Sequence, residues 1–192
     1  TRGICSGGIR PMIPELQDIG TERNVLPLGR YLCTLDELRD RFVPEESDKR
    51  KKIFAAFQFI IGLLKEAFGS VCEVWVGGSF VTSKEEPGDI DAVFVIRADL
   101  FDHARDTELG RFAIWGLNTK HGFSSLIDAF VLFIHPTGVD NEAVAEGEYD
   151  YMKSRGYWDQ FWSKTRSVTV EETGESYPSA GYLEVMLDGF GA

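Results

Sequence analysis

The sequence has no long apolar segment. Its apolar runs, such as residues 93–96 and 129–134, have the length of β-strands, whereas a membrane-spanning helix needs about 20 apolar residues. We therefore expect no membrane partner. Residues 1–11 lack an initiator methionine and the long apolar stretch of a secretory signal. Met12 is a candidate natural start, with residues 1–11 as an upstream extension; the alternative, that residues 1–11 are native, stays open.

Basic residues are also scarce, with 20 Lys and Arg against 31 Asp and Glu and a formal net charge of −11. Proteins that grip a nucleic-acid backbone usually present a basic surface, because counterion release supplies much of their affinity. Extended nucleic-acid binding is therefore disfavoured, although a local basic pocket for a small anion is not.

Cysteine and histidine are few and scattered. The cysteines Cys5, Cys33 and Cys72 are odd in number, and no cysteine or histidine pattern has the spacing of a metal site. This cysteine usage fits a reduced, cytoplasmic protein. His121 and His135 have no partner pattern, and we interpret both as structural.

The chain does have the length and apolar content of one globular domain, with 192 residues of which 43% are hydrophobic. Residues 1–33 are assigned to an extended N-terminal arm and residues 34–192 to the domain. We expect an α/β (α+β) fold in which helices flank a small mixed sheet. The expected elements are helices at 35–42 and 48–68, a strand at 71–76, a helical turn at 80–83, a strand at 89–96, a mostly helical segment at 99–118 that breaks near Gly110, a strand at 125–134, a helix at 148–165 and a strand at 181–187.

Local signals predict the ends of the first two helices. Thr34 and Glu37 have the spacing of a capping box, and Pro44 stops the helix that follows. Ser47 is the expected N-cap of the second helix, and Gly69 is its expected C′ residue.

Two aspartates open an apolar strand, although aspartate is depleted from strands. Because strand side chains alternate between faces, Asp89 and Asp91 point the same way. Two such carboxylates repel each other unless a cation or a shared proton intervenes, and their oxygens suit Mg²⁺. Asp128 interrupts a second apolar strand. If the two strands are neighbours, Asp128 completes a three-carboxylate cluster that holds two metal ions.

A glycine turn, Gly77-Gly78-Ser79, precedes the first aspartate. A glycine turn that leads into a helix exposes backbone N–H groups suited to an anion, and the Ser79 hydroxyl adds a donor. The nine-residue loop 80–88 brings this phosphate-binding turn and the carboxylates to the same edge of the sheet.

These residues resemble the signature of the nucleotidyltransferase fold, the superfamily that includes DNA polymerase β. Gly78, Ser79, Asp89, Asp91 and Asp128 match its positions in order. The resemblance implies that the turn contacts the phosphates of a nucleotide and that the carboxylates bind two Mg²⁺ ions, for which Mn²⁺ is an expected substitute. It also implies that the third carboxylate helps to activate the attacking hydroxyl.

The chain is also similar to an uncharacterised group of short bacterial proteins in that superfamily. The shared segments are LPLGRY at 26–31, GSFVTSKEEPGDID at 78–91, RGYWDQFW at 155–162 and GYLEVML at 181–187. This similarity spans nearly all of residues 12–192 but brings no substrate with it.

We therefore expect a Mg²⁺-dependent nucleotidyltransferase that moves a nucleoside monophosphate from an NTP to an acceptor hydroxyl. The acceptor can be a partner protein, a small molecule or an RNA end, and a toxin–antitoxin or defence setting is among the expected contexts. The alternatives are a noncatalytic nucleotide-binding or regulatory module that kept the fold, and a two-metal nuclease, which has no need of the glycine turn.

Several other residues are weaker candidates for the site. The aromatic residues between 149 and 162 have helical spacing, and we interpret them as packing rather than as a base-stacking shelf. Weaker candidates for phosphate contacts are Ser83, Lys84, Lys120, Arg155, Lys164 and Arg166.

Overall fold

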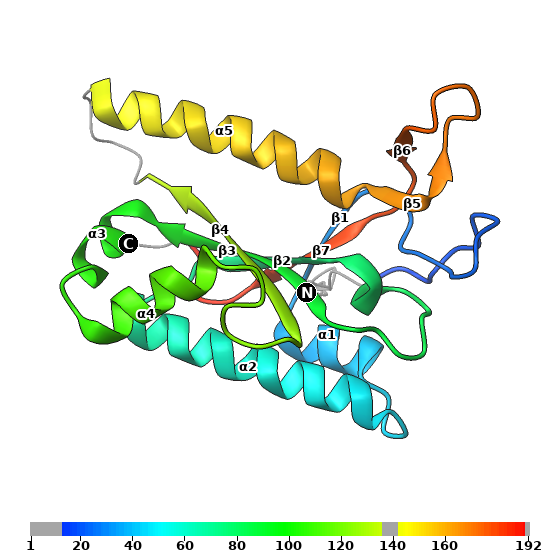
Figure 1. Cartoon of the computed structure of the whole chain (residues 1–192), viewed down its shortest axis with the longest axis horizontal. Coiled ribbons are helices and arrows are strands. Elements are labelled where there is room, and N and C mark those ends of the chain that lie inside the picture. Colours follow the sequence, from blue (N-terminus) through cyan, green and yellow to red (C-terminus); the bar gives the residue numbers. More distant parts are fainter. Residues whose placement is uncertain (1–12, 136–141, 191–192) are drawn as a thin grey trace, which may run out of the picture.

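The computed structural model describes residues 13–135 and 142–190, which form one mixed α/β domain (Figure 1). The elements in chain order are β1 Arg30–Cys33, α1 Leu35–Phe42, α2 Asp48–Phe68, β2 Glu73–Gly77, the 3₁₀ turn η1 Gly78–Val81, β3 Ile90–Arg97, α3 Ala98–Ala104, α4 Glu108–Leu117, β4 Ile127–Ile134, α5 Glu142–Trp162, β5 Lys164–Thr169, β6 Ser176–Pro178 and β7 Tyr182–Met186. No helix within the described ranges is long and apolar enough to cross a membrane.

The main sheet has five strands in the order β1-β7-β2-β3-β4. Its two outer pairs, β1–β7 and β3–β4, are parallel, whereas β2 runs antiparallel to both β7 and β3. Strands β5 and β6 form a separate two-stranded sheet. The predicted fold class, a small mixed sheet flanked by helices, is confirmed.

Helices cover both faces of the sheet. Figure 1 shows α5 alone on one side and α1 to α4 on the other. Alternation along β3 divides its side chains between the two layers, since Phe94 belongs to the large apolar cluster with α2, whereas Val93 and Val95 belong to a smaller cluster with Trp162 of α5. Side chains of known register can therefore be assigned to the α2 face or the α5 face.

The predicted helix ends of α1 and α2 are confirmed. The hydroxyl of Thr34 accepts a hydrogen bond from the backbone N–H of Glu37 at 3.2 Å, and the Glu37 carboxylate accepts one from the N–H of Thr34 at 2.8 Å. Ser47 accepts from the backbone N–H of Arg50 at 3.3 Å. Gly69 ends α2 in the left-handed conformation, with φ 83°.

The segment expected to be mostly helical at 99–118 forms two helices. The break comes just before α4, where Thr107 caps the helix by accepting a hydrogen bond from the N–H of Gly110 at 2.9 Å. Gly110 also lies against α3, because a Cβ on it would overlap the carbonyl oxygen of Ala104. The sequence signal near Gly110 therefore marks the packing of α4 on α3.

Several other boundaries differ from the sequence-based expectation: β2 begins at Glu73 rather than 71, and β4 begins at Ile127 rather than 125. Arg30–Cys33, assigned to the extended arm, is the edge strand β1 and pairs with β7. Helix α5 spans Glu142–Trp162 rather than 148–165, and its earlier end is explained by Lys164–Thr169, which pairs as β5. The helical turn expected at 80–83 begins earlier, at Gly78. Residues 1–12 lie outside the described residues.

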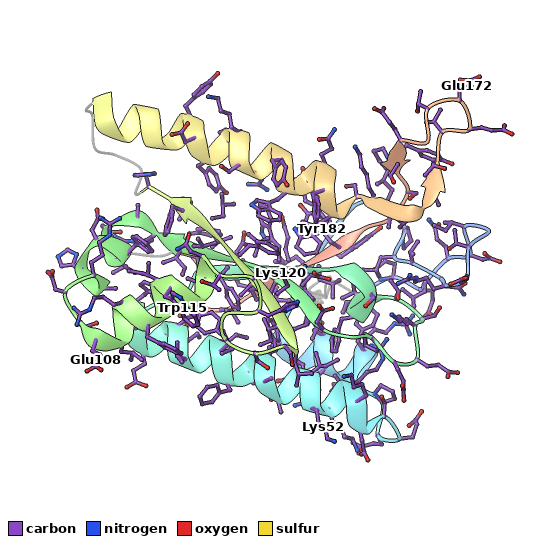
Figure 2. All side chains as sticks on the ribbon, viewed as in Figure 1. Lys52, Glu108, Trp115, Lys120, Glu172 and Tyr182 are labelled. Atoms are coloured by element: carbon purple, nitrogen blue, oxygen red, sulfur yellow. The ribbon has the colours of Figure 1, made fainter. Side chains whose placement is uncertain are left out.

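A polar network joins α5 to the sheet. Tyr182 of β7, which lies under the C-terminal half of α5 (Figure 2), donates to the Asp159 carboxylate at 2.8 Å. Beside it, the buried Glu73 carboxylate accepts from the indole N–H of Trp75 at 2.7 Å. Burial raises the pKa of Glu73, although the Trp75 hydrogen bond opposes that shift. The network therefore contains a carboxylate whose charged form is disfavoured by folding.

Replacing Glu73 with glutamine should stabilise the protein at neutral pH. A carboxyl whose pKa is raised on folding contributes stability at low pH and loses it as the pH rises through the raised value. The introduced amide stays neutral and its oxygen still accepts from Trp75, so the melting temperature of Glu73→Gln should exceed that of the wild type at pH 7–8. Each kcal/mol recovered corresponds to roughly 2–4 °C.

The advantage of Glu73→Gln should shrink as the pH falls into the ordinary glutamate range. Glu172→Gln, at an exposed position (Figure 2), is the control and should show no such pH dependence. A Glu73→Gln variant less stable than the wild type at pH 8 would show that the charged form is the favoured one.

Candidate functional site

Two carboxylates lie side by side on the α5 face of the sheet. Asp91 of β3 and Asp128 of β4 are register partners in the parallel pair, and adjacent strands are about 4.8 Å apart. Both residues share a face with side chains of the smaller cluster, because Asp91 lies two residues before Val93 on β3 and Asp128 lies four residues before Leu132 on β4. The condition that the two strands be neighbours is therefore met, and both carboxylates share one face.

One oxygen of this pair has no protein partner. Asp128 is half-buried, but its Oδ1 is fully buried and accepts no hydrogen bond. A buried carboxylate oxygen without a donor is costly. A hard cation such as Mg²⁺ is a chemical partner for it, because such ions take carboxylate oxygens as ligands. The residues present therefore fit a divalent metal.

Asp89, the third predicted carboxylate, lies just before β3 and is half-exposed. Within residues 13–135 and 142–190, no three His, Cys, Asp or Glu side chains are placed to hold a metal ion together. The structure thus brings Asp91 and Asp128 together, and the predicted three-carboxylate group is not formed in it.

The glycine turn stands next to this pair. Gly77 ends β2 as the register partner of Asp91, and Gly78 begins η1 with a φ of 67°. A Cβ on Gly78 would overlap Oδ2 of Asp91, so the carboxylate occupies the space that any side chain would fill. Because η1 has only four residues, anion contacts here would come from individual N–H groups and the Ser79 hydroxyl rather than from a helix dipole.

Trp162, the last residue of α5, packs on Gly77. A Cβ on Gly77 would overlap Cε3 of the indole ring, so the absence of a side chain lets the ring touch the strand. The burial of Trp162 agrees with the interpretation of the α5 aromatic residues as packing, but that interpretation is wrong for Tyr149, Tyr157 and Phe161, which are each more than half exposed. This contact joins Gly77 and Trp162, which are 85 positions apart in the sequence.

Arg50 fixes the backbone that follows the turn, and no clear sequence signal marks it, since Arg50 belongs to the charged run DKRKK. The side chain is only 5% exposed. It donates to the carbonyl oxygens of Phe42 and Phe80 at 2.8 Å each, of Thr82 at 3.0 Å and of Lys84 at 2.5 Å. Burial lowers its pKa. One detectable hint is that Arg50 lies three residues before Ile53, on the buried stripe of α2.

The weaker phosphate candidates have mixed roles. The hydroxyl of Ser83 accepts from the backbone N–H of Asn24 at 2.8 Å, which ties the loop to the N-terminal segment. Arg155 lies 3.7 Å from the Glu184 carboxylate and 5.6 Å from the Trp75 ring centre. It therefore belongs to the polar network that joins α5 to the sheet. Lys84 is exposed and lines two surface cavities of about 540 and 670 Å³. Neither cavity is lined by Asp91 or Asp128.

His121, interpreted as structural, adopts a φ of 53°. Its Nδ1 lies 3.2 Å from the carbonyl oxygen of Ile127, the residue before Asp128. This contact helps to fix the start of β4, and the structural interpretation agrees with it.

Comparison with known proteins places the chain in a family. The model of a family of unknown function (DUF6932) matches residues 19–186, which include β1, the glycine turn, all three aspartates and β7. No curated protein and no solved structure matches the chain.

Side chains added at the two glycines should destabilise the protein. Gly77→Ala forces the buried Trp162 ring to move, and overpacking of this kind costs about 1–3 kcal/mol. Gly78→Ala strains a positive φ at a cost of about 1–2 kcal/mol and displaces the Asp91 carboxylate. Gly156→Ala in α5, where a Cβ meets no neighbouring atom, should instead stabilise by about 0.5–1 kcal/mol. Urea unfolding measures all three, and a neutral Gly77→Ala would contradict the tight contact.

Loss of Arg50 should be among the costliest single changes. Arg50→Met leaves several buried carbonyl oxygens without a donor, which should cost on the order of 3 kcal/mol. Arg50→Lys should recover only part of this, since an ammonium lacks the planar fork that reaches several carbonyls. Lys52→Met, at an exposed position of α2 (Figure 2), is the matched control and should change stability by less than about 0.5 kcal/mol. Equal effects of Arg50→Met and Lys52→Met would refute the role of Arg50.

Proposed function

The chain belongs to the DUF6932 family, and we propose that it is a Mg²⁺-dependent nucleotidyltransferase with a DNA polymerase β-like catalytic arrangement. The observation that carries this proposal is the register pair of Asp91 and Asp128 beside a glycine turn. The unpartnered Oδ1 of Asp128 adds support, because it leaves a ligand position open for a cation.

Each element of the site has a distinct task in the proposed reaction. Gly78 and Ser79, with Gly77 before them, bind phosphate oxygens of the NTP through backbone N–H groups and the Ser79 hydroxyl. Asp91 and Asp128 hold the metal, together with Asp89, which directly precedes β3. When bound, two Mg²⁺ ions, or Mn²⁺ in their place, supply charge stabilisation at the phosphates and lower the pKa of the acceptor hydroxyl.

Asp128 has a second task, as the proton acceptor for the attacking hydroxyl. The acceptor oxygen forms a bond to the α-phosphorus, its proton passes to the Asp128 carboxylate, and the bond from the α-phosphorus to the pyrophosphate oxygen breaks. The fold supplies positioning for this step, because β3 and β4 hold the two carboxylates in register and Arg50 fixes the loop after the turn.

The acceptor is proposed to be a hydroxyl of a partner protein, a small molecule or an RNA end. The net charge of −11 disfavours a long nucleic acid. A noncatalytic nucleotide-binding module is the second candidate, and one observation favours it: the described residues do not gather three carboxylates into a metal-binding group. The two candidates differ in whether label from the α-phosphate of an NTP becomes covalently attached to an acceptor.

The Asp128→Asn variant should separate binding from folding. A ligand at about 100 times its Kd stabilises a protein by about 2.7 kcal/mol, or roughly 5–10 °C for a chain of this size. The wild type should show such a Mg²⁺-dependent shift with at least one of ATP, GTP, CTP and UTP. Asp128→Asn should lose the shift and all transfer from α-labelled NTP, while its own melting temperature stays equal or rises, because an unpaired buried charge is removed.

The matched control is Glu86→Gln, which neutralises an exposed carboxylate in the loop before the pair and should leave both readouts unchanged. Transfer activity retained in Asp128→Asn would rule out its role. A Mg²⁺-dependent shift without transfer to any acceptor would favour the noncatalytic module.

A further inference from the structure

Two aromatic side chains near the C-terminal end of α5 are open to solvent. Tyr157 is 57% exposed and Phe161 is 51% exposed, although aromatic rings usually contribute their large apolar area to a core or an interface. Their rings are nearly parallel, with centres 6.0 Å apart and an angle of 20° between the planes. The pair therefore forms a preformed aromatic surface that the fold itself does not bury.

The pair lies on the side of α5 that faces β3 and β4. Successive helix residues are rotated by about 100°, so Tyr157 and Phe161, two positions before and after Asp159, point away from it. Asp159 accepts a hydrogen bond from Tyr182 of β7 and lies 3.8 Å from Arg30 of β1. In the strand order β1-β7-β2-β3-β4, the opposite side of α5 is therefore the side of the strands that carry the carboxylate pair.

One contact connects Phe161 to the glycine turn. Its ring meets the ring of Trp162 nearly edge-on, with centres 5.8 Å apart and an angle of 82°. The edge of Trp162 that carries Cε3 and Cζ3 packs on Gly77. Phe161 is therefore separated by one aromatic ring from the turn that is proposed to bind the phosphates.

A second contact connects Phe161 to the strand of Asp128. Phe161 meets the ring of Trp158 at 5.8 Å and 87°, and the Trp158 ring centre lies 4.7 Å from that of Phe130. Phe130 is two residues after Asp128 in β4, so both side chains are on the α5 face of the sheet. The exposed pair is thus joined through packed rings to the strand that carries Asp128 as well as to the turn.

We propose that Phe161, flanked by Tyr157, stacks on the nucleobase of the NTP bound at the glycine turn. This inference rests on the proposed function, since it takes its ligand from that site. The ribose separates a nucleobase from its phosphates, so the base belongs beyond the turn, where the exposed pair lies. Stacking uses the π-face that every base has. All four NTPs should therefore bind, and ATP and GTP should bind more tightly than CTP and UTP, because a purine buries more apolar area.

Phe161→Ala tests the proposal, with Tyr149→Ala as the matched control. Tyr149 is another exposed aromatic residue of α5, but it lies about 18 Å before Phe161 along the helix. Titration calorimetry with Mg²⁺ and ATP or GTP should show binding about tenfold weaker for Phe161→Ala. Tyr149→Ala, and Phe161→Tyr, which keeps the ring, should bind within about twofold of the wild type. Equal Kd values for Phe161→Ala and the wild type would overturn the proposal.

Inorganic tripolyphosphate with Mg²⁺ separates stacking from phosphate binding. It carries the phosphates of an NTP without a base, so Phe161→Ala should bind it as the wild type does. An equal loss of affinity for tripolyphosphate and for the NTP would overturn the proposal, because it would show that the substitution disturbs the turn. A wild type that binds tripolyphosphate as tightly as every NTP would also overturn it. If the wild type binds neither tripolyphosphate nor any NTP, the proposed function itself fails, and this result is distinct from the others.

Discussion

The buried guanidinium of Arg50 is the interaction on which the geometry of the site depends. Its partners are carbonyl oxygens from the end of α1 and from alternate residues of the loop after the glycine turn. Backbone carbonyl dipoles, rather than a carboxylate, stabilise the Arg50 charge. The loop is therefore held to α2 without a further acidic side chain beside Asp91 and Asp128. These hydrogen bonds fix the backbone of residues 80–84, the first part of the chain that leads from the glycine turn to Asp91.

The two faces of the sheet have different physical characters. The α2 face is a continuous apolar layer and supplies most of the hydrophobic stabilisation. The α5 face combines a smaller apolar cluster with Glu73, Asp91, Asp128 and an unsatisfied indole. Such polar features are unfavourable for stability and are expected where a protein retains groups for binding or catalysis. The large core on one face offsets the cost of the groups on the other.

Features with local causes could be predicted from the sequence, and features made by distant contacts could not. Thr34, Ser47 and Gly69 act on their own helix ends, so the bounds of α1 and α2 were predicted correctly. The apolar runs after Asp91 and after Asp128 likewise predicted two strands. Their pairing, which the sequence left as a condition, brings the two carboxylates together. By contrast, β1 is a strand only because β7 pairs with it, and the burial of Arg50 and Trp162 depends on partners far away in the sequence. None of these has a strong local pattern.

The strand order has a consequence for synthesis of the chain. β7 leaves the ribosome after the other four strands of the main sheet, yet it lies between β1 and β2 and pairs with both. A nascent chain that has already formed β2, β3 and β4 therefore exposes the backbone N–H and C=O groups of β2 until residue 186 emerges. Open strand edges of this kind can pair with other chains and aggregate. The elements of the candidate site are complete before the sheet that supports them, so protection of this edge during translation is a separate requirement for the protein.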